Sequence, residues 1–238
     1  MVSPLKQQRD ALLKAKQTNH AVAHDATASL DSLHLRLIEF EQDKKALKSF
    51  VQIAQKVNHK REVLIPKYKP VAEAYLEAGE RYQNPIFQDL IVWLFDIEEL
   101  ETAIAWCLKA IEHDLPTPEN FKRNWPTVCA DFVLEWATKQ QEHGRSVEPY
   151  FSQVFKLIDG EWELNEKVEA KWYKFAGYCL LLNEKGAPQP SQVGDKEQLE
   201  ASMALLLKAH EKNQKIGVKT QIDKIQMRIN ALDEGKNL

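Results

Sequence analysis

A run of basic side chains between positions 44 and 69 is the part of this chain best suited to chemistry. Glu62 is the one acidic residue in the run, so its net charge is +7. Such a charge suits a polyanion such as DNA, because phosphates that are neutralised by lysine or arginine release condensed counterions. Polar neighbours such as Gln52 and Gln55 are able to hydrogen-bond to phosphates or base edges. An ordinary solvated helix face is the alternative. The candidate DNA-binding residues are Lys44, Lys45, Lys48, Lys56, Lys60, Arg61, Lys67 and Lys69.

A set of carboxylates between positions 89 and 101 offers a second chemistry. Clustered acidic side chains hold Mg²⁺ in enzymes that cleave phosphodiesters. Asp96, Glu98 and Glu99, however, stand where a helix is expected to begin, and the helix dipole alone favours acidic residues there. We therefore expect these groups to cap a helix, with a nuclease site as the alternative. The full set is Asp89, Asp96, Glu98, Glu99 and Glu101.

Other motifs for catalysis or cofactor binding are not found in the sequence. It contains no GxxxxGK[ST] phosphate loop, so we expect no ATP hydrolysis by this chain. Cys107, Cys129 and Cys179 lie far apart among apolar residues and have no zinc-ligand spacing. We expect them to be small buried hydrophobic side chains in a reducing compartment. We therefore predict no catalytic residue, no metal and no cofactor.

The charge is distributed unevenly along the 238 residues, although the whole chain has a net charge of only −3. Residues 1–70 contain 13 basic and 7 acidic side chains, whereas residues 71–165 contain 7 basic and 18 acidic ones. Residues 166–238 are close to neutral, with 12 basic and 10 acidic side chains. A basic segment joined to an acidic body is a plausible layout for a protein that binds a polyanion.

The strongest periodic pattern runs from Ser29 to Asn58. Its apolar residues recur in steps of three and four, and Lys44 and Asn58 occupy seam positions at which polar residues fix the register of a coiled coil. A helix of this length spans roughly 40 Å at about 1.5 Å per residue. The pattern fits either an antiparallel hairpin within the chain or a helix that joins subunits. In the second case the oligomerisation residues are Leu30, Leu33, Leu37, Phe40, Leu47 and Val51.

Shorter amphipathic segments follow this pattern. Pro66 and Pro70 are expected to interrupt the helix, because proline lacks an N–H and disfavours helical geometry in the preceding residue. The last two predicted helices carry matching apolar seams, one from Leu199 to His210 and one from Val218 to Leu232. Beyond Pro70, helices are predicted over about residues 70–78, 84–95, 97–113, 125–143, 147–158, 165–182, 195–212 and 217–232, with a loop rich in Gly and Pro at 183–194.

These patterns predict an all-α fold, because glycines number only 8 and no segment alternates as a strand does. We expect a long N-terminal helix followed by stacked antiparallel helix hairpins, in a tetratricopeptide-like arrangement. No apolar run approaches the roughly 18 residues of a membrane helix, and no signal peptide is evident, so we expect a soluble intracellular protein with no membrane partner. The predicted regions are a flexible polar arm (1–27), a long basic helix for DNA binding and oligomerisation (28–69), a central helical domain (70–182) and a C-terminal helix hairpin (195–238).

The turn from Thr117 to Pro126 places two basic side chains between two aromatic ones. Lys122 and Arg123 lie between Phe121 and Trp125, and such surfaces suit protein interfaces and nucleic acid alike. The alternative is that the two aromatic side chains pin the loop onto the neighbouring helices.

Three stretches, with the spacing between them, carry a resemblance to a known family. They are REVLIPKYKPVAEAYLEAG, FQDLIVWLFDIEELETAIAWCLKAIEHDL and PTPENFKR. In this order they resemble the small subunit of the DNA-packaging terminase of Peduovirus-like temperate tailed phages. The likeness is good over residues 60–140 and looser over residues 165–232.

The resemblance implies a protein of the host cytoplasm that recognises the cohesive-end site of double-stranded phage DNA. It also implies a large terminase subunit as partner, which carries the ATPase and nuclease, and self-assembly into a homo-oligomer such as a ring. Family members are commonly labelled the endonuclease subunit. Two alternatives therefore stay open, a helical-repeat adaptor that binds only the large subunit and a metal-dependent endonuclease.

Overall fold

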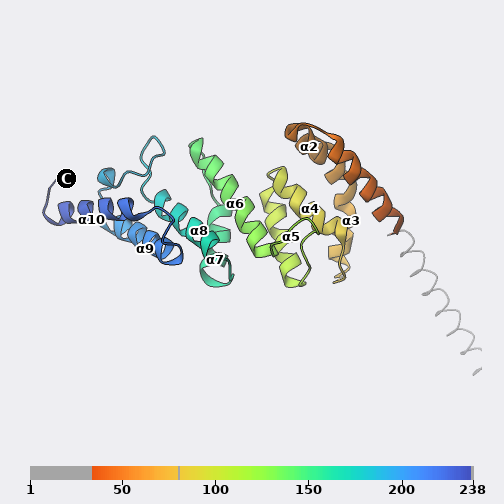
Figure 1. Ribbon diagram of the computed structural model, residues 1–238. Coiled ribbons are helices and arrows are strands. Elements are labelled where there is room, and N and C mark those ends of the chain that lie inside the picture. The colour runs from red at the N-terminus through yellow and green to blue at the C-terminus, as the bar shows by residue number, and fades with distance from the viewer. Residues whose placement is uncertain (1–33, 80, 237–238) are drawn as a thin grey trace, which may run out of the picture. The chain divides into compact units, whose positions relative to one another are not determined.

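The computed structural model describes residues 34–79 and 81–236, and the predicted arm at residues 1–27 lies outside this part of the chain. Within the described residues the regular structure is helical (Figure 1), apart from one isolated bridge between Leu182 and Pro188. The all-α prediction is thus confirmed. The chain divides into two compact units. Residues 34–79 and 84–90 form what we call the N-terminal unit, and residues 81–83 and 91–236 form the C-terminal unit.

The N-terminal unit is built on an antiparallel helix hairpin. Its first arm is helical over residues 34–49, and its second arm is a continuous helix made of α2 (Ile53–His59), a π-helical turn (Lys60–Leu64) and α3 (Ile65–Glu77). Phe40 packs edge-on against Tyr68 with ring centroids 4.9 Å apart, and Phe50 lies 5.0 Å from the ring of His59. The pairing partners run in opposite directions along the two arms. The hairpin therefore closes at residues 50–52, and we call residues 50–55, which include this turn and the start of α2, the tip.

The tip corrects the prediction of one unbroken helix from Ser29 to Asn58. The first arm ends at residue 49, residues 50–52 are not helical, and Gln52 has an extended backbone before α2 begins. The heptad pattern continues across the break because Phe40 and Leu47 face the second arm of the same chain, where a coiled-coil partner would otherwise lie. Periodicity alone does not distinguish an internal hairpin from a longer helix.

The two prolines do not interrupt the second arm, which corrects another prediction. Pro66 is the second residue of α3, and Pro70 lies inside this helix. In the turn before Pro66 the N–H of Ile65 bonds to the carbonyl of Lys60, five residues back, so the regular pattern is already relaxed where a proline would break it. Burial of an apolar stripe offsets the roughly 3 kcal/mol cost of an internal proline. The stripe consists of Leu64, Ile65, Tyr68, Ala72 and Tyr75.

Helix α4 (Pro85–Asp96) begins where the sequence predicts. The buried Asn84 side chain accepts hydrogen bonds from the backbone N–H groups of Ile86 and Phe87, at 3.1 and 3.2 Å. These bonds satisfy two of the donors that a helix start leaves unpaired. In the N-terminal unit Phe87 then packs against Tyr75, with ring centroids 5.4 Å apart. The first residues of α4 thereby complete the core of the hairpin.

The C-terminal unit continues with α5 (Leu100–Glu112), α6 (Trp125–Glu142), α7 (Tyr150–Gly160) and α8 (Glu166–Cys179). Asn124 caps α6 and Asn165 caps α8 through side-chain oxygens, as their place before amphipathic runs suggests. Helix α5 contacts α6, and α6 contacts both α7 and α8. The tetratricopeptide-like arrangement of these helices stays a prediction.

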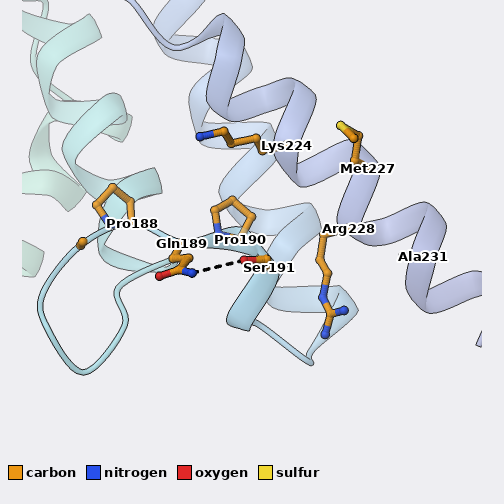
Figure 2. A pocket seen from close by; sticks show the side chains of 9 residues that line it. Pro188, Gln189, Pro190, Ser191, Lys224, Met227, Arg228 and Ala231 are labelled. Carbon is orange, nitrogen blue, oxygen red and sulfur yellow. Dashed lines mark hydrogen bonds between the residues drawn. The ribbon is translucent and has the colours of Figure 1, made fainter. Parts of the chain in front are cut away.

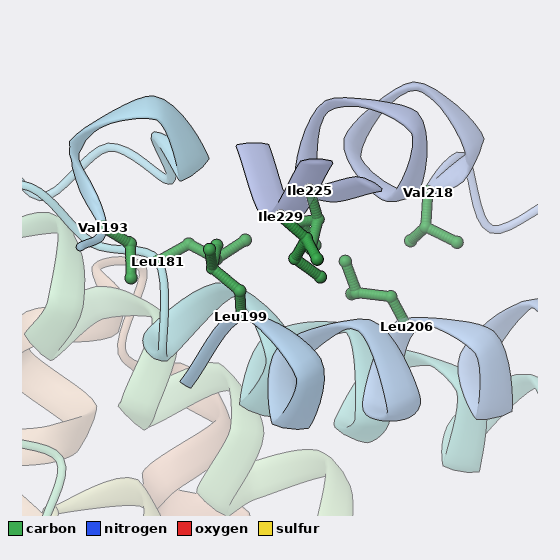
Figure 3. Packing of buried hydrophobic residues seen from close by; sticks show 7 residues of the cluster. All are labelled: Leu181, Val193, Leu199, Leu206, Val218, Ile225 and Ile229. Atoms are coloured by element: carbon green, nitrogen blue, oxygen red, sulfur yellow. The ribbon is translucent and has the colours of Figure 1, made fainter. Parts of the chain in front are cut away.

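The last two helices form the predicted hairpin. Helix α9 (Lys196–Lys212) packs against α8 and against α10 (Lys219–Asp233), and the side chain of Asp195 caps α9. Figure 3 shows their buried side chains meeting between the helices, joined by residues of the preceding loop. The core cluster consists of Leu181, Val193, Leu199, Leu206, Val218, Ile225 and Ile229, with Met203, Ile222 and Leu232 packed beside it. Most of the predicted seam residues are thus confirmed as core.

Helices α8 and α9 approach each other most closely at Gly177. A Cβ atom there would lie 2.7 Å from Cδ2 of Leu206, and the Gly177 carbonyl accepts a hydrogen bond of 2.8 Å from the hydroxyl of Ser202. We expect Gly177→Ala to reduce the free energy of unfolding by about 1–3 kcal/mol through overpacking. Urea denaturation measures this loss. Gly160→Ala is the matched control, since its Cβ meets nothing within 4 Å, and equal stability of the two variants would contradict the expectation.

The cysteines are free thiols, and the predicted burial is confirmed for two of them. Cys107 and Cys129 are fully buried, whereas Cys179 is partly exposed. A hydrogen bond with the Cys107 thiol, together with burial, raises the pKa of Cys129. Among the described residues, no helix is long and apolar enough to cross a membrane.

Candidate nucleic-acid interface

The eight predicted DNA-binding cations form two groups in the structure, which differ in whether they have interaction partners among the described residues. Lys44 and Lys67 form ion pairs with carboxylates of the N-terminal unit. Lys60 and Arg61 take part in further interactions, and Lys60 lies within electrostatic range of Asp89. In the described part of the chain, no carboxylate pairs with the four others, which are Lys45, Lys48, Lys56 and Lys69.

Lys44 joins the hairpin to the start of α4. Its Nζ lies 2.8 Å from Oδ2 of Asp89 and 3.0 Å from Oε1 of Glu41. The side chain of Lys44 is 23% exposed and that of Asp89 is 11% exposed. Burial raises the pKa of Asp89, and the charge of Lys44 offsets only part of this effect. Burial alone would lower the pKa of Lys44, but the hydrogen bonds to Asp89 and Glu41 outweigh it and raise the pKa. Lys44 thus has a structural partner that the sequence did not reveal.

Lys67 is held on the opposite arm of the hairpin. Its Nζ lies 2.7 Å from both Oε1 of Glu39 and Oδ2 of Asp43, and the hydroxyl of Tyr68 donates to the same Asp43 oxygen at 2.7 Å. Burial would raise the pKa of Asp43, but the hydrogen bonds from Lys67 and Tyr68 outweigh it and lower the pKa. The charge of Lys67 is therefore neutralised within the hairpin.

Three of the four cations without a carboxylate partner lie near the closed end of the hairpin, whereas Lys69 lies in α3, away from that end. Lys48 and Lys56 are the nearest charged residues on either side of the tip, and Lys45 lies one helical turn further back. Lys45 and Lys48 are exposed and Lys56 is half-buried. No acidic residue occurs between positions 44 and 61. The tip thus presents positive charge from both arms with no carboxylate between them in the sequence.

The predicted oligomerisation residues have several different environments. Leu30 and Leu33 lie outside the described residues, Phe40 and Leu47 are buried inside the hairpin, and Leu37 is half-buried. Val51 is 92% exposed at the tip, where it is followed by Ile53 at 79% exposure. Sequence reasoning missed Ile53, together with Leu35 and Ile38 on the exposed side of the first arm, because they lie off the heptad seam.

The predicted carboxylates lie either in an ion pair or near the ends of helices α4 and α5. Asp89 pairs with Lys44, as described above, and Asp96 is the last residue of α4. Glu98 has a positive φ of 62° in the turn before α5, and Glu99 is the N-cap residue of that helix, although its side chain makes no capping bond. Helix α5 thus begins later than predicted. Among the described residues, no group of three His, Cys, Asp or Glu side chains is arranged to hold a metal ion.

The turn from Thr117 to Pro126 is pinned by one of its aromatic side chains. Trp125 is buried, and its Nε1 donates a 3.1 Å hydrogen bond to the carbonyl of Pro116. Arg123 forms an ion pair with Asp131, while Lys122 is exposed. The predicted structural role is confirmed for Trp125, and Arg123 is neutralised by Asp131 of the following helix α6.

A groove lies between α10 and the loop before α9, within the C-terminal unit. It has a volume of about 770 Å³. The amide of Gln221 donates to the carbonyl of Pro188 at 3.0 Å, and Nε of Arg228 donates to the carbonyl of Val193 at 2.9 Å, so both bonds hold the loop on α10. Figure 2 shows the prolines of the loop facing α10 across this space. The lining residues are Ala187, Pro188, Gln189, Pro190, Ser191, Lys224, Met227, Arg228 and Ala231.

Comparison with known proteins shows which protein family the chain is similar to. A family model described as the phage small terminase subunit matches residues 37–167. The chain is 35% identical over 227 residues to a protein of Haemophilus phage HP1 (strain HP1c1) called "Probable terminase, endonuclease subunit", with 94% of this chain and 81% of the relative covered. It is 23% identical over 198 residues to the "Terminase, endonuclease subunit" of Escherichia phage P2, with 83% and 74% covered. No solved structure matches the chain.

The matched region begins inside the first arm of the hairpin and extends to the first residues of α8. It therefore includes the tip, all eight predicted DNA-binding cations and the turn at Trp125. It covers more than half of the chain, and the match to the phage HP1 protein covers nearly all of it. On this evidence the chain belongs to the family of phage small terminase subunits, which serve DNA packaging.

Proposed function

We propose that this chain recognises double-stranded phage DNA at the cohesive-end site and that the hairpin tip makes the contact. The observation that carries the proposal is the grouping of Lys45, Lys48 and Lys56 around the tip without carboxylate partners, whereas Lys44 and Lys67 are neutralised further down the hairpin. Cations without protein partners keep their full charge for phosphates, and each phosphate they neutralise releases counterions.

Sequence readout needs polar groups as well as charge, because phosphate contacts fix position and base contacts specify sequence. Gln52 and Gln55 are exposed at the tip, between Lys48 and Lys56. Amide side chains pair well with adenine in the major groove. The tip thus combines phosphate-binding cations with two side chains able to contact base edges.

The bound DNA would then pass to the large terminase subunit, whose ATPase and nuclease cut and package it. In this view the chain is the recognition subunit, and it acts as a homo-oligomer, for which a ring is one form. Leu35 and Ile38, exposed on the first arm, offer apolar surface for self-association of the hairpins.

The second candidate function is that of an adaptor that binds only the large subunit. The groove beside α10 favours it, because an apolar floor that includes Met227 at 71% exposure is flanked by Lys224 and Arg228. Such a surface suits an apolar segment with acidic residues. Both relatives are called endonuclease subunits, and this name keeps a nuclease as a third candidate function.

Binding assays on the full chain separate these functions. A mobility-shift titration compares cohesive-end DNA with unrelated duplex of equal length over a series of salt concentrations. Tighter binding to cohesive-end DNA, with affinity that falls steeply as salt rises, supports the recognition function. No binding to either duplex contradicts it and favours the adaptor. Mg²⁺-dependent nicking by the isolated chain, lost in Asp96→Asn or Glu99→Gln, would support the nuclease.

A further inference from the structure

Val51 and Ile53 at the hairpin tip are the two most exposed large hydrophobic side chains among the described residues, at 92% and 79%. They lie two positions apart, at the turn between the two arms. Aliphatic side chains left in water do not gain the favourable free energy that their burial would give. Burial of this exposed pair by a binding partner would therefore be favourable.

The tip is held firmly enough to act as a wedge. Phe50, which precedes Val51, packs against the ring of His59 on the second arm, with centroids 5.0 Å apart. The Ser49 hydroxyl donates to the carbonyl of Ala46, which closes the end of the first arm. Ile53 is the first residue of α2, whose N–H at Lys56 bonds to the carbonyl of Gln52 at 3.2 Å. The turn is thus fixed on both sides of the exposed pair.

The charges around the pair indicate the kind of partner. Lys45 and Lys48 come from one arm and Lys56 from the other, and no acidic residue lies between positions 44 and 61. An apolar point between cations on two sides complements a base step between two phosphate strands. Proteins that insert an apolar side chain between base pairs unstack them and bend the duplex, and they hold it through cations on the flanking phosphates.

A second copy of the chain fits this surface less well. Stable interfaces bury about 800 Å² on each partner, of which two aliphatic side chains supply only a small part. Two tips that met would also bring their lysines together, and like charges repel. Insertion between two base pairs of DNA, in contrast, requires only the two apolar side chains and the cations beside them.

We propose that Val51 and Ile53 form a wedge that enters a base step and bends the DNA bound by the tip. The wedge rests on the proposed DNA-binding function and adds a deformation of the duplex to it. Steps that unstack easily, such as TA and CA/TG, would then be preferred at this position without any hydrogen bond to their bases.

The test uses the full chain with Val51→Gln and Ile53→Gln together. DNA bending is followed by energy transfer between dyes at the ends of a duplex of about 30 base pairs, and unstacking by the fluorescence of 2-aminopurine placed along the site. The unmodified chain is expected to shorten the distance between the ends and to raise the fluorescence at one step. The double variant is expected to lose both signals while its affinity falls less than about tenfold, since the phosphate contacts remain.

A matched control variant separates the effect of the tip from a general loss of exposed apolar surface. Leu207→Gln changes an exposed apolar residue of the C-terminal unit that does not line the groove beside α10, and this variant is expected to bend DNA as the unmodified chain does. An unmodified chain that binds DNA without bending it would overturn the wedge alone, as would a double variant that still bends DNA. A chain that binds no DNA would overturn the proposed function as well. A double variant whose native mass drops to a smaller oligomer would overturn the wedge in favour of self-association.

Discussion

Replacing Lys45, Lys48 and Lys56 together by glutamate is expected to weaken binding to cohesive-end DNA by about 100-fold or more at low salt. All three side chains lack a carboxylate partner among the described residues, so each reversal removes a phosphate contact and adds repulsion. The slope of log K against log salt should become shallower by about 2.7, from roughly 0.9 for each of three phosphates. Fluorescence anisotropy over a salt series measures both quantities.

The control for this experiment changes the net charge equally at other sites. Lys122, Lys185 and Lys215 are exposed in the C-terminal unit, and their replacement by glutamate is expected to reduce affinity only slightly. Thermal denaturation should show that both triple variants remain folded, because five of the six substituted residues are exposed and exposed substitutions usually alter stability by less than about 0.5 kcal/mol. Equal loss of affinity in the two variants would show that net charge, rather than the tip, governs binding.

Lys44→Glu is expected to act on stability, although the sequence suggests that Lys44 contacts DNA. The substitution places a third carboxylate beside Asp89 and Glu41, and Asp89 is largely buried. Loss of one partner of a buried ion pair typically costs about 3–5 kcal/mol, because the other charge is left uncompensated. The free energy of unfolding, measured in urea, should fall by this amount. Lys45→Glu, on the adjacent exposed residue, should leave it nearly unchanged.

A charge swap tests the same pair directly. Lys44→Glu combined with Asp89→Lys restores opposite charges at the two positions, so part of the lost stability should return, as a double-mutant cycle measures. A double variant no more stable than the sum of the single losses would argue against direct pairing. DNA binding by the folded fraction should change much less than in the triple variant at the tip.

The sequence predicted the helices best where local signals agree. Asn84 and Asp195 were recognisable as starts of amphipathic runs, and the seams of α9 and α10 follow from residues such as Leu199 and Ile225, which recur on one face. The hairpin was predicted less well. A break at residues 50–52 leaves the heptad pattern intact, and the burial that retains Pro70 inside a helix depends on contacts with another arm.

The candidate site shows the same division. A net charge of +7 over positions 44–69 correctly marks a basic segment, yet it does not reveal which cations are neutralised. The partners of Lys67, namely Glu39 and Asp43, precede the run, and Asp89, the largely buried partner of Lys44, lies 45 positions after Lys44. Such pairings depend on the packing of the arms, which charge counts cannot supply. The exposure of Ile53 was missed because it lies off the heptad seam, whereas Val51 was named from the seam as an oligomerisation residue.

The π-helical turn at Lys60–Leu64 has a consequence for how this protein tolerates change in length. A π-helical turn accommodates one residue more than an α-helical turn, and each residue rotates an α-helix by about 100°. Deleting one residue at this turn would restore an α-helix and leave the faces on either side in phase. A deletion elsewhere in the second arm would rotate the part of the helix next to the tip by about 100° relative to the rest of the arm. The second arm thus holds a spare residue at a turn where its loss would leave the direction of the tip unchanged.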